Sequence, residues 1–188
     1  MAHHNRGLAL QLSGQTDRAI ADYDEAIRLN PGYSLARVNR GLMFNRKGEF
    51  DRAIADFDRA IKLDGKIALA HHNRGNAYAR RREHDRAIAD LDQAIKLNGS
   101  AAVAFNDRGL AYGAQGDLDR AIKDFDQAIT LDPKSAPAYT NRGVAYSVKG
   151  DYDQAAVWLQ KAIDADPSRA GTHLRMGYVM QAAKRPTE

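Results

Sequence analysis

The residues best able to do chemistry recur as a fixed triplet instead of gathering at one place. Arg precedes Gly at intervals of 34 residues, and Asn usually precedes Arg. The copies are Asn5-Arg6-Gly7, Asn39-Arg40-Gly41, Asn73-Arg74-Gly75, Asp107-Arg108-Gly109 and Asn141-Arg142-Gly143. Asn supplies a hydrogen-bond donor and an acceptor, and Arg supplies charged donors only. The triplet therefore points to hydrogen bonding and ion pairing, and function is to be sought there.

The remaining polar residues do not form a recognisable catalytic or metal site. The chain has no phosphate-binding glycine loop, HExxH motif or nucleophile elbow. Its carboxylates are periodic, whereas an active site is normally unique; one such set is Asp17, Asp51, Asp85, Asp119 and Asp153. The adjacent His71 and His72 point about 100° apart on a helix, so they cannot make the paired face that binds zinc. The sequence predicts no enzyme, no cofactor and no metal site.

Composition sets the class of protein. Of the 188 residues, 44% are hydrophobic and 28% are charged, values that suit a folded chain. The net charge of +4 is a small excess, and many of the arginines recur at fixed phases, so nucleic-acid binding is a minor hypothesis. There is no cysteine, and no stretch approaches a membrane span. We expect a cytoplasmic protein, with the periplasm left open.

A period of 34 residues predicts helical pairs that bury their apolar faces only by stacking. In the clearest unit we expect helices over 102–114 and 119–131, separated by a turn at 115–117 and ended by Pro133. Gly109 in mid-helix costs about 1 kcal/mol against Ala, so its recurrence indicates close helix packing. The predicted units form one array over 1–188, with repeats 1–33, 34–67, 68–101, 102–135 and 136–169 and a capping helix 170–188.

This pattern resembles the tetratricopeptide repeat family, whose unit has a mid-helix Gly, a Tyr three residues later, two spaced Ala and a late Pro. The matching residues of one unit are Gly109, Tyr112, Ala121, Ala128 and Pro133. The resemblance implies an all-α, right-handed superhelical solenoid of five helix-turn-helix units plus a C-terminal capping helix, with a concave face built mainly from the first helices. The departures, Gly65 and Gly99 for Pro and Arg82 for a turn Gly, are expected to change only local geometry.

The arginines of the triplet need partners, because an isolated buried charge is costly. Aspartates recur fifteen residues after each Gly, but Trp158 takes the fifth place. Pairing within a repeat would leave Arg142 against Trp158, whereas pairing between repeats sets Trp158 against the apolar Met176. We favour the second rule, with the arginines as ligand contacts as the competing interpretation. The predicted inter-repeat pairs are Asp22 with Arg40, Asp56 with Arg74, Asp90 with Arg108, and Asp124 with Arg142.

The asparagines of the triplet define a candidate peptide-binding groove. Residues three or four positions away share their helix face and are largely apolar. A similar asparagine ladder lines the repeats of O-linked N-acetylglucosamine transferases, where it holds peptide backbone. The alternative is that Asn only hydrogen-bonds between repeats. The candidate binding residues are Asn39, Asn73, Asp107, Asn141, Leu42, Asn76, Leu110, Val144 and His72, with Arg46 and Arg80 at the helix ends.

These features favour a non-catalytic scaffold that binds an extended peptide or partner segment. The cation set of the co-chaperone carboxylate clamp is missing, so a chaperone tail is not the expected ligand. The alternative is a regulatory or substrate-recruiting portion of a larger enzyme such as a glycosyltransferase. The chain begins inside a first helix, so we expect a possible piece of a longer array and self-association through the array ends.

Overall fold

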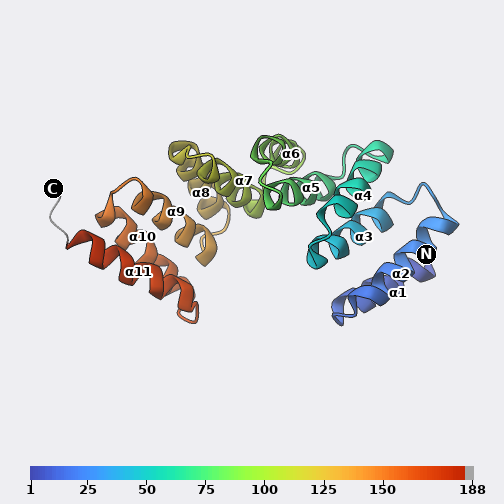
Figure 1. The fold of residues 1–188 in the computed structure, drawn as a ribbon, viewed down its shortest axis with the longest axis horizontal. Helices are drawn as coiled ribbons and strands as arrows, with labels where there is room; N and C mark the ends of the chain where they lie inside the picture. The colour runs from blue at the N-terminus through green and yellow to red at the C-terminus, as the bar shows by residue number, and fades with distance from the viewer. Residues whose placement is uncertain (185–188) are drawn as a thin grey trace. The chain divides into compact units, whose positions relative to one another are not determined.

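The computed structural model describes residues 1–184. Within them the regular structure is helical, in five pairs followed by a final helix (Figure 1). The helices are α1 (Ala2–Leu12), α2 (Thr16–Leu29), α3 (Ser34–Lys47), α4 (Phe50–Leu63), α5 (Ala68–Arg80), α6 (His84–Leu97), α7 (Ala102–Ala114), α8 (Leu118–Leu131), α9 (Ala136–Val148), α10 (Tyr152–Ala165) and α11 (Ala170–Ala183).

The predicted all-α class is confirmed, with sequential antiparallel pairs. Helix α7 has the expected bounds, and α8 begins one residue before the expected 119. Each pair falls inside one expected repeat. The final helix α11 occupies Ala170–Ala183, and positions 185–188 of the expected capping helix lie outside the described residues.

The turn inside each pair needs one residue in the left-handed conformation. Four of these residues are glycines, with φ between 75° and 84°: Gly14, Gly48, Gly116 and Gly150. Arg82 takes the same place in the third pair with φ 64°, the one non-glycine residue with positive φ in the described chain. A side chain in this conformation costs roughly 1–2 kcal/mol, so the third pair makes the same turn as the others but with local strain at Arg82.

The mid-helix glycines are contact points, as expected from their recurrence. A Cβ placed on Gly41 would lie 2.7 Å from Cε1 of Phe57, and one on Gly143 would lie 2.9 Å from Cγ of Leu159. Gly177 in α11 has the same phase but has nothing within 4 Å of that position. The difference arises because α11 is not followed by a second helix among the described residues.

The core is built from small and large residues of both helices of each pair, among them Val38, Met43 and Phe44 of α3. In the second helices the alanines that recur at the positions of Ala19 and Ala26 are at most 4% exposed, and the large side chains between them are equally buried: Tyr23, Phe57, Leu91, Phe125 and Leu159. These side chains fill the space that the glycines of the first helices leave open. The first helices are thus fixed against the second, and their remaining faces are free to carry other residues.

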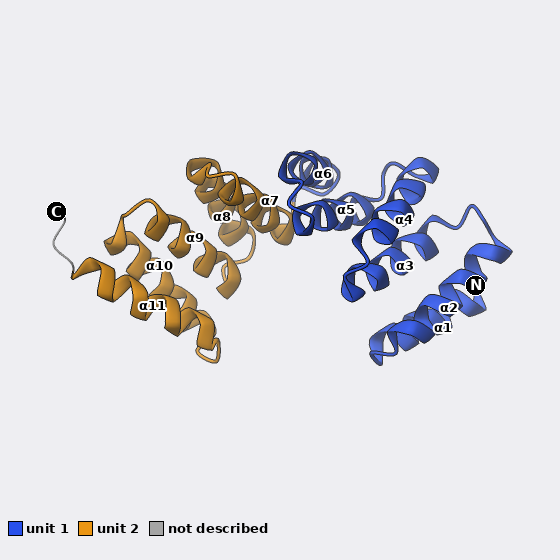
Figure 2. Ribbon diagram, viewed as in Figure 1, with its two compact units in different colours: residues 1–99 blue, residues 100–188 orange. Residues whose placement is uncertain are grey.

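The contacts divide the chain into two compact units (Figure 2). Unit 1 is Met1–Gly99 and contains α1 to α6, and unit 2 begins at Ser100 and contains α7 to α11. No helix within residues 1–184 combines the length and apolarity needed to cross a bilayer.

Candidate interaction surface

One face of α3 collects four of the residues of interest. Leu35, Asn39, Leu42 and Arg46 are spaced at i, i+4, i+7 and i+11, which places them on one side of a helix. Leu35 is 48% exposed and Arg46 is also exposed, while Asn39 and Leu42 are partly buried. The face therefore runs from an apolar end through an amide to a cationic end.

The equivalent face of α5 repeats this order one repeat later, with Leu69, Asn73, Asn76 and Arg80. Leu69 is 48% exposed, as is typical of a side chain that still offers apolar surface to a partner. Helices α3 and α5 are neighbours, since the Asn45 side chain donates to the Asn73 carbonyl at 3.2 Å. We call the two faces together the first-helix surface of unit 1.

The asparagines of the triplet make hydrogen bonds within the protein. The side-chain amide of Asn39 lies 2.9 Å from Nε2 of His4, which belongs to the preceding repeat. In unit 2, Asn141 donates to Oδ1 of Asn106 at 2.8 Å over the same sequence separation. These contacts follow the alternative in which Asn links neighbouring repeats.

Asn73 behaves differently because the residue that corresponds to His4 is the apolar Val38. Its amide turns back to the carbonyl of Leu69 at 2.7 Å, and the residue is only 8% exposed. The neighbouring Asn76 lies 3.4 Å from Nε2 of His72 on the same helix. Asn73 is thus the least accessible of the candidate asparagines.

The corresponding faces of unit 2 lack the cationic end. On α7 the order is Val103, Asp107, Leu110 and Ala114, and Val103 and Leu110 are 61% and 47% exposed. On α9 the positions of Asn141 and Val144 are followed by Val148, which is 67% exposed. Asp107 accepts from the Asn106 amide at 3.2 Å. Unit 2 therefore presents Ala114 and Val148 where unit 1 presents arginines, and α7 has a carboxylate in the place of the asparagine.

The arginines of the triplet, here called the arginine column, pair with aspartates of their own repeats, which corrects the between-repeat rule. Arg40 donates two hydrogen bonds to Asp56, of 2.7 and 2.5 Å. The favoured rule would have given Asp56 to Arg74. The same two-pronged contact joins Arg6 to Asp22, Arg74 to Asp90, and Arg108 to Asp124. These four aspartates are no more than 6% exposed, so each carboxylate is satisfied inside its own helical pair.

A second aspartate, which the sequence analysis overlooked, links the repeats. Arg40 also donates from Nη1 to Asp24 of the preceding repeat at 2.6 Å, and Arg74 donates to Asp58 in the same way. Asp24, Asp58, Asp92 and Asp126 recur at 34-residue intervals, a signal that the sequence already carried. The hydrogen bonds to Asp56 are the main cause that raises the pKa of Arg40, against the opposing effect of burial.

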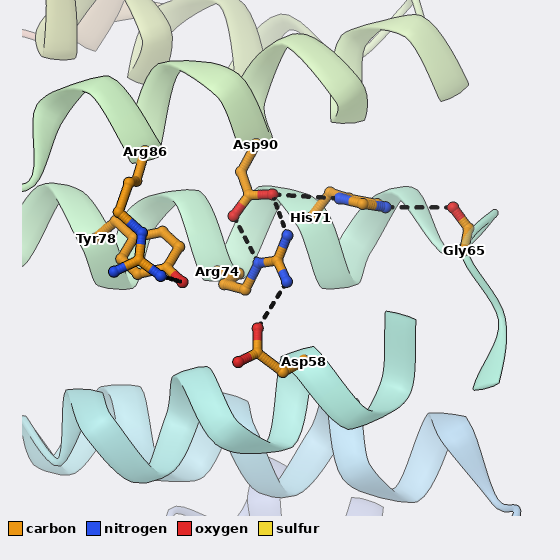
Figure 3. Close-up of polar contacts among 7 residues, drawn as sticks. All are labelled: Asp58, Gly65, His71, Arg74, Tyr78, Arg86 and Asp90. Carbon is orange, nitrogen blue, oxygen red and sulfur yellow. Dashed lines mark hydrogen bonds and ion pairs between the residues drawn. The ribbon is translucent and has the colours of Figure 1, made fainter. Parts of the chain in front are cut away.

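Figure 3 shows this arrangement around Arg74, which lies between Asp90 of its own repeat and Asp58 of the preceding one. His71 is buried beside it, with Nδ1 3.3 Å from Asp90 and Nε2 3.2 Å from the Gly65 carbonyl. Arg86 lies over the ring of Tyr78, 3.9 Å from its centroid. Through these contacts the cluster ties the α4–α5 connection and α4 to the third pair, so its role is to stabilise the fold.

The column ends at Trp158, and the within-repeat rule holds there too. The guanidinium of Arg142 lies 3.6 Å from the centroid of the Trp158 ring, where other repeats have a carboxylate. Lys161 lies over the same ring at 4.1 Å, and Tyr139 stacks on it at 6.0 Å. A ring attracts a cation but does not accept the Nε proton, so Arg142 Nε is buried without a hydrogen-bond partner. Met176 packs on the core near Leu159.

Two hollows on the described surface lie at turns, and each is lined by residues that form an ion pair. One of about 370 Å³ is lined by Glu49, Asp51 and Arg81, and Arg81 pairs with Asp51 at 2.5 Å. Another of about 510 Å³ is lined by Asp119 and Lys149, which pair at 2.6 Å. Within residues 1–184 no group of three His, Cys, Asp or Glu could hold a metal ion. These hollows are periodic junctions between repeats.

A family model described as a tetratricopeptide repeat matches residues 4–67, 46–103, 72–136 and 106–170. Among solved structures, that of MamA is 29% identical, with a TM-score of 0.78 over 88% of this chain and 96% of its own. YrrB, described as a TPR protein with an unusual peptide-binding site, is 25% identical, with a TM-score of 0.76 over 95% of this chain and 90% of its own.

PilW, described as a widely conserved type IV pilus biogenesis factor, has a TM-score of 0.90 over 97% of this chain and 84% of its own. It is only 17% identical, so this likeness shows the fold alone. A search among curated proteins gives no match.

Proposed function

Because the chain belongs to the tetratricopeptide repeat family, we propose that it is a non-catalytic interaction scaffold that binds an extended peptide or partner segment across its first helices. The repeats are packed by their glycines and alanines and tied together by Arg–Asp pairs. Each first helix buries one face in the core, and the face that carries Leu35 on α3 and Leu69 on α5 is left to bind. The proposed ligand is a protein segment, with no cofactor.

The observation that carries the proposal is the row of half-exposed leucines on neighbouring first helices. Leu35 and Leu69 are 34 residues apart and each is 48% exposed, so they stand at one level of adjacent helices. Apolar side chains in register on a surface otherwise rich in charge are typical of an interaction site. Burial of such side chains supplies affinity, and nearby amides supply direction.

The hydrogen bonds within the protein distinguish the asparagine that can still contact a peptide from the one that cannot. Asn39 uses one amide proton on His4, which leaves it a second donor and an acceptor for a peptide backbone. Asn73 is buried against its own helix, so we assign it to stability. The proposed contacts in unit 1 are therefore Leu35, Leu69 and Asn39, and the likeness to YrrB, whose description names a peptide-binding site, supports this kind of ligand.

A displayed library of random 12-residue peptides tests the proposal with the full chain immobilised. The test variant is Leu35→Ser with Leu69→Ser, and the matched control is Leu12→Ser with Leu29→Ser, which removes two exposed leucines elsewhere in unit 1. We expect peptides selected on the unmodified chain to bind the test variant about tenfold more weakly, because two partly buried leucine contacts are lost. The control variant should bind as the unmodified chain does.

Circular dichroism melts of both variants separate lost binding from lost folding. Unchanged melting with weaker binding in the test variant alone supports the proposal. A library that yields no enriched peptide, or peptides that bind both variants equally, would overturn it.

A further inference from the structure

Two arginines at the end of the first-helix surface of unit 1 take no part in the ion pairs that tie the repeats together. Arg46 and Arg80 are exposed and occupy the same phase of α3 and α5. Within residues 1–184 neither guanidinium makes a hydrogen bond or an ion pair; Arg46 acts on Tyr23 through its charge, and Arg80 lies over the Phe50 ring at 5.9 Å from the centroid. Both are available to a ligand that crosses the surface.

Their sequence neighbours are in the opposite condition. Lys47 is bound to Asp17 at 2.8 Å and to Glu49 at 3.2 Å, and Arg81 is bound to Asp51 and Glu83. The fold therefore neutralises one cation at each helix end and leaves the adjacent one open. The open pair lies on the face that also carries the half-exposed leucines.

The positive charge of the chain is also unevenly placed. Unit 1 has 17 Lys and Arg against 13 Asp and Glu, a net charge of +4, whereas residues 100–188 have 11 of each and no net charge. The whole positive excess thus belongs to the unit that presents Arg46 and Arg80. Such a field favours a ligand of negative charge.

We infer that the first-helix surface of unit 1 selects acidic peptides, an inference that rests on the proposed function. The apolar side chains of the peptide lie on Leu35 and Leu69, and two carboxylates pair with Arg46 and Arg80. The leucine and arginine of each face are 11 residues apart, about 16 Å along the helix, so a segment of several residues is needed to reach both.

The spacing of the helices sets the spacing of the carboxylates. Packed helices lie about 8–10 Å apart, and a polyproline II segment brings residues i and i+3 to the same side at about 9.3 Å. The peptide that fits Arg46 and Arg80 therefore has Glu or Asp at two positions three residues apart. A guanidinium binds each carboxylate through a fork of donors.

Single-stranded nucleic acid is the other polyanion to consider, and the surface does not favour it. Such ligands need aromatic side chains on which bases stack. In unit 1 Tyr23, Phe44, Phe57 and Tyr78 are at most 4% exposed, Tyr33 and Phe50 are partly buried, and the exposed large apolar residues are aliphatic. Aliphatic side chains beside cations suit a peptide with apolar and acidic residues.

Two matched pools of synthetic 12-residue peptides test the inference on the immobilised full chain. Each has one fixed Leu, and the pools carry either Glu or Gln at two positions three residues apart. We expect the Glu pool to be retained about fivefold more than the Gln pool at low salt, since two exposed ion pairs form. The preference should vanish in Arg46→Gln with Arg80→Gln and persist in Arg59→Gln with Lys62→Gln, which removes the same charge from α4.

The outcomes separate the inference from the proposed function. Equal retention of both pools, with loss of both in Leu35→Ser with Leu69→Ser, overturns the acidic preference and leaves the scaffold standing. Retention of neither pool overturns both. Binding of oligo-dT that depends on Arg46 and Arg80, without any preference between the peptide pools, overturns the inference in favour of nucleic acid.

Discussion

In unit 1 the interior arginines of the triplet hold an aspartate on each side, whereas in unit 2 the last of them lies against a tryptophan ring. Arg40 bridges Asp56 and Asp24, and its side chain is 20% exposed. Arg142 retains Asp126 at 2.5 Å but meets Trp158 in place of the second carboxylate. One position of the repeat therefore makes either a bridge of hydrogen bonds or a cation–ring contact.

The exposed faces differ in the same direction. Arg46 and Arg80 end the first-helix faces of unit 1, and Ala114 and Val148 end those of α7 and α9 in unit 2. The packed positions are nearly constant between the units, because the glycines and alanines must fit. The exposed positions vary freely, and they distinguish what each unit can recognise.

Removal of the bridging arginine gives the largest expected effect. Arg40→Ala leaves Asp56 in a site where its side chain is 6% exposed, without a counter-charge, so we expect a loss of about 3–5 kcal/mol in the free energy of unfolding. Arg142→Ala removes a cation–ring contact and leaves Asp126, whose side chain is 42% exposed, so about 1 kcal/mol is expected. Urea unfolding followed by circular dichroism measures both.

The control for this pair is Arg59→Ala, an exposed arginine of α4 without a hydrogen bond or ion pair among the described residues. It should change the free energy of unfolding by less than about 0.5 kcal/mol. Equal losses for Arg40→Ala and Arg142→Ala would contradict the distinction between the two kinds of contact.

The arginine column also shows how far the sequence could be taken. Helix positions, the close packing at Gly109 and the all-α class follow from periodicity, because a repeated residue occupies a repeated environment. The choice of aspartate did not follow, since both pairing rules fit the 34-residue spacing. Only the direction of the Arg40 side chain decides it, and that depends on packing between helices.

The asparagines were a harder case for the same reason. Their spacing predicted one face, but not whether each amide would be used internally. Asn39 and Asn141 find polar partners in the preceding repeat, whereas Asn73 meets the apolar position of Val38 and turns to its own helix. A repeated residue thus acquires different contacts when its neighbour varies, so its accessibility had to come from the structure.

The column of glycines offers a comparison of intermediate size, with opposite signs at Gly41 in α3 and Gly177 in the unpaired α11. Gly41→Ala would place a methyl group 2.7 Å from the fully buried ring of Phe57, so a loss of about 1–3 kcal/mol is expected. Gly177→Ala has open space and gains helix propensity, so a gain of up to about 1 kcal/mol is expected. The same urea titration measures both, and a gain for Gly41→Ala would refute close packing at this phase.

The smallest expected effect concerns the turn between α5 and α6 in unit 1, where Arg82 stands in the place of the glycine found in the other turns. Arg82 has φ 64°, whereas Gly116 and Gly150 serve the equivalent turns of unit 2. Arg82→Gly relieves the left-handed strain of a side chain but adds freedom to the unfolded chain, so we expect a net gain of about 0.5–1 kcal/mol. In a chain of 188 residues this corresponds to a rise in melting temperature of roughly 1–4 °C. The matched change Arg81→Gly, at a position with φ of −84°, should lower it because the Asp51 pair is lost. If both substitutions lower the melting temperature, strain at Arg82 does not limit stability, and the exposed guanidinium of Arg82 contributes to the fold.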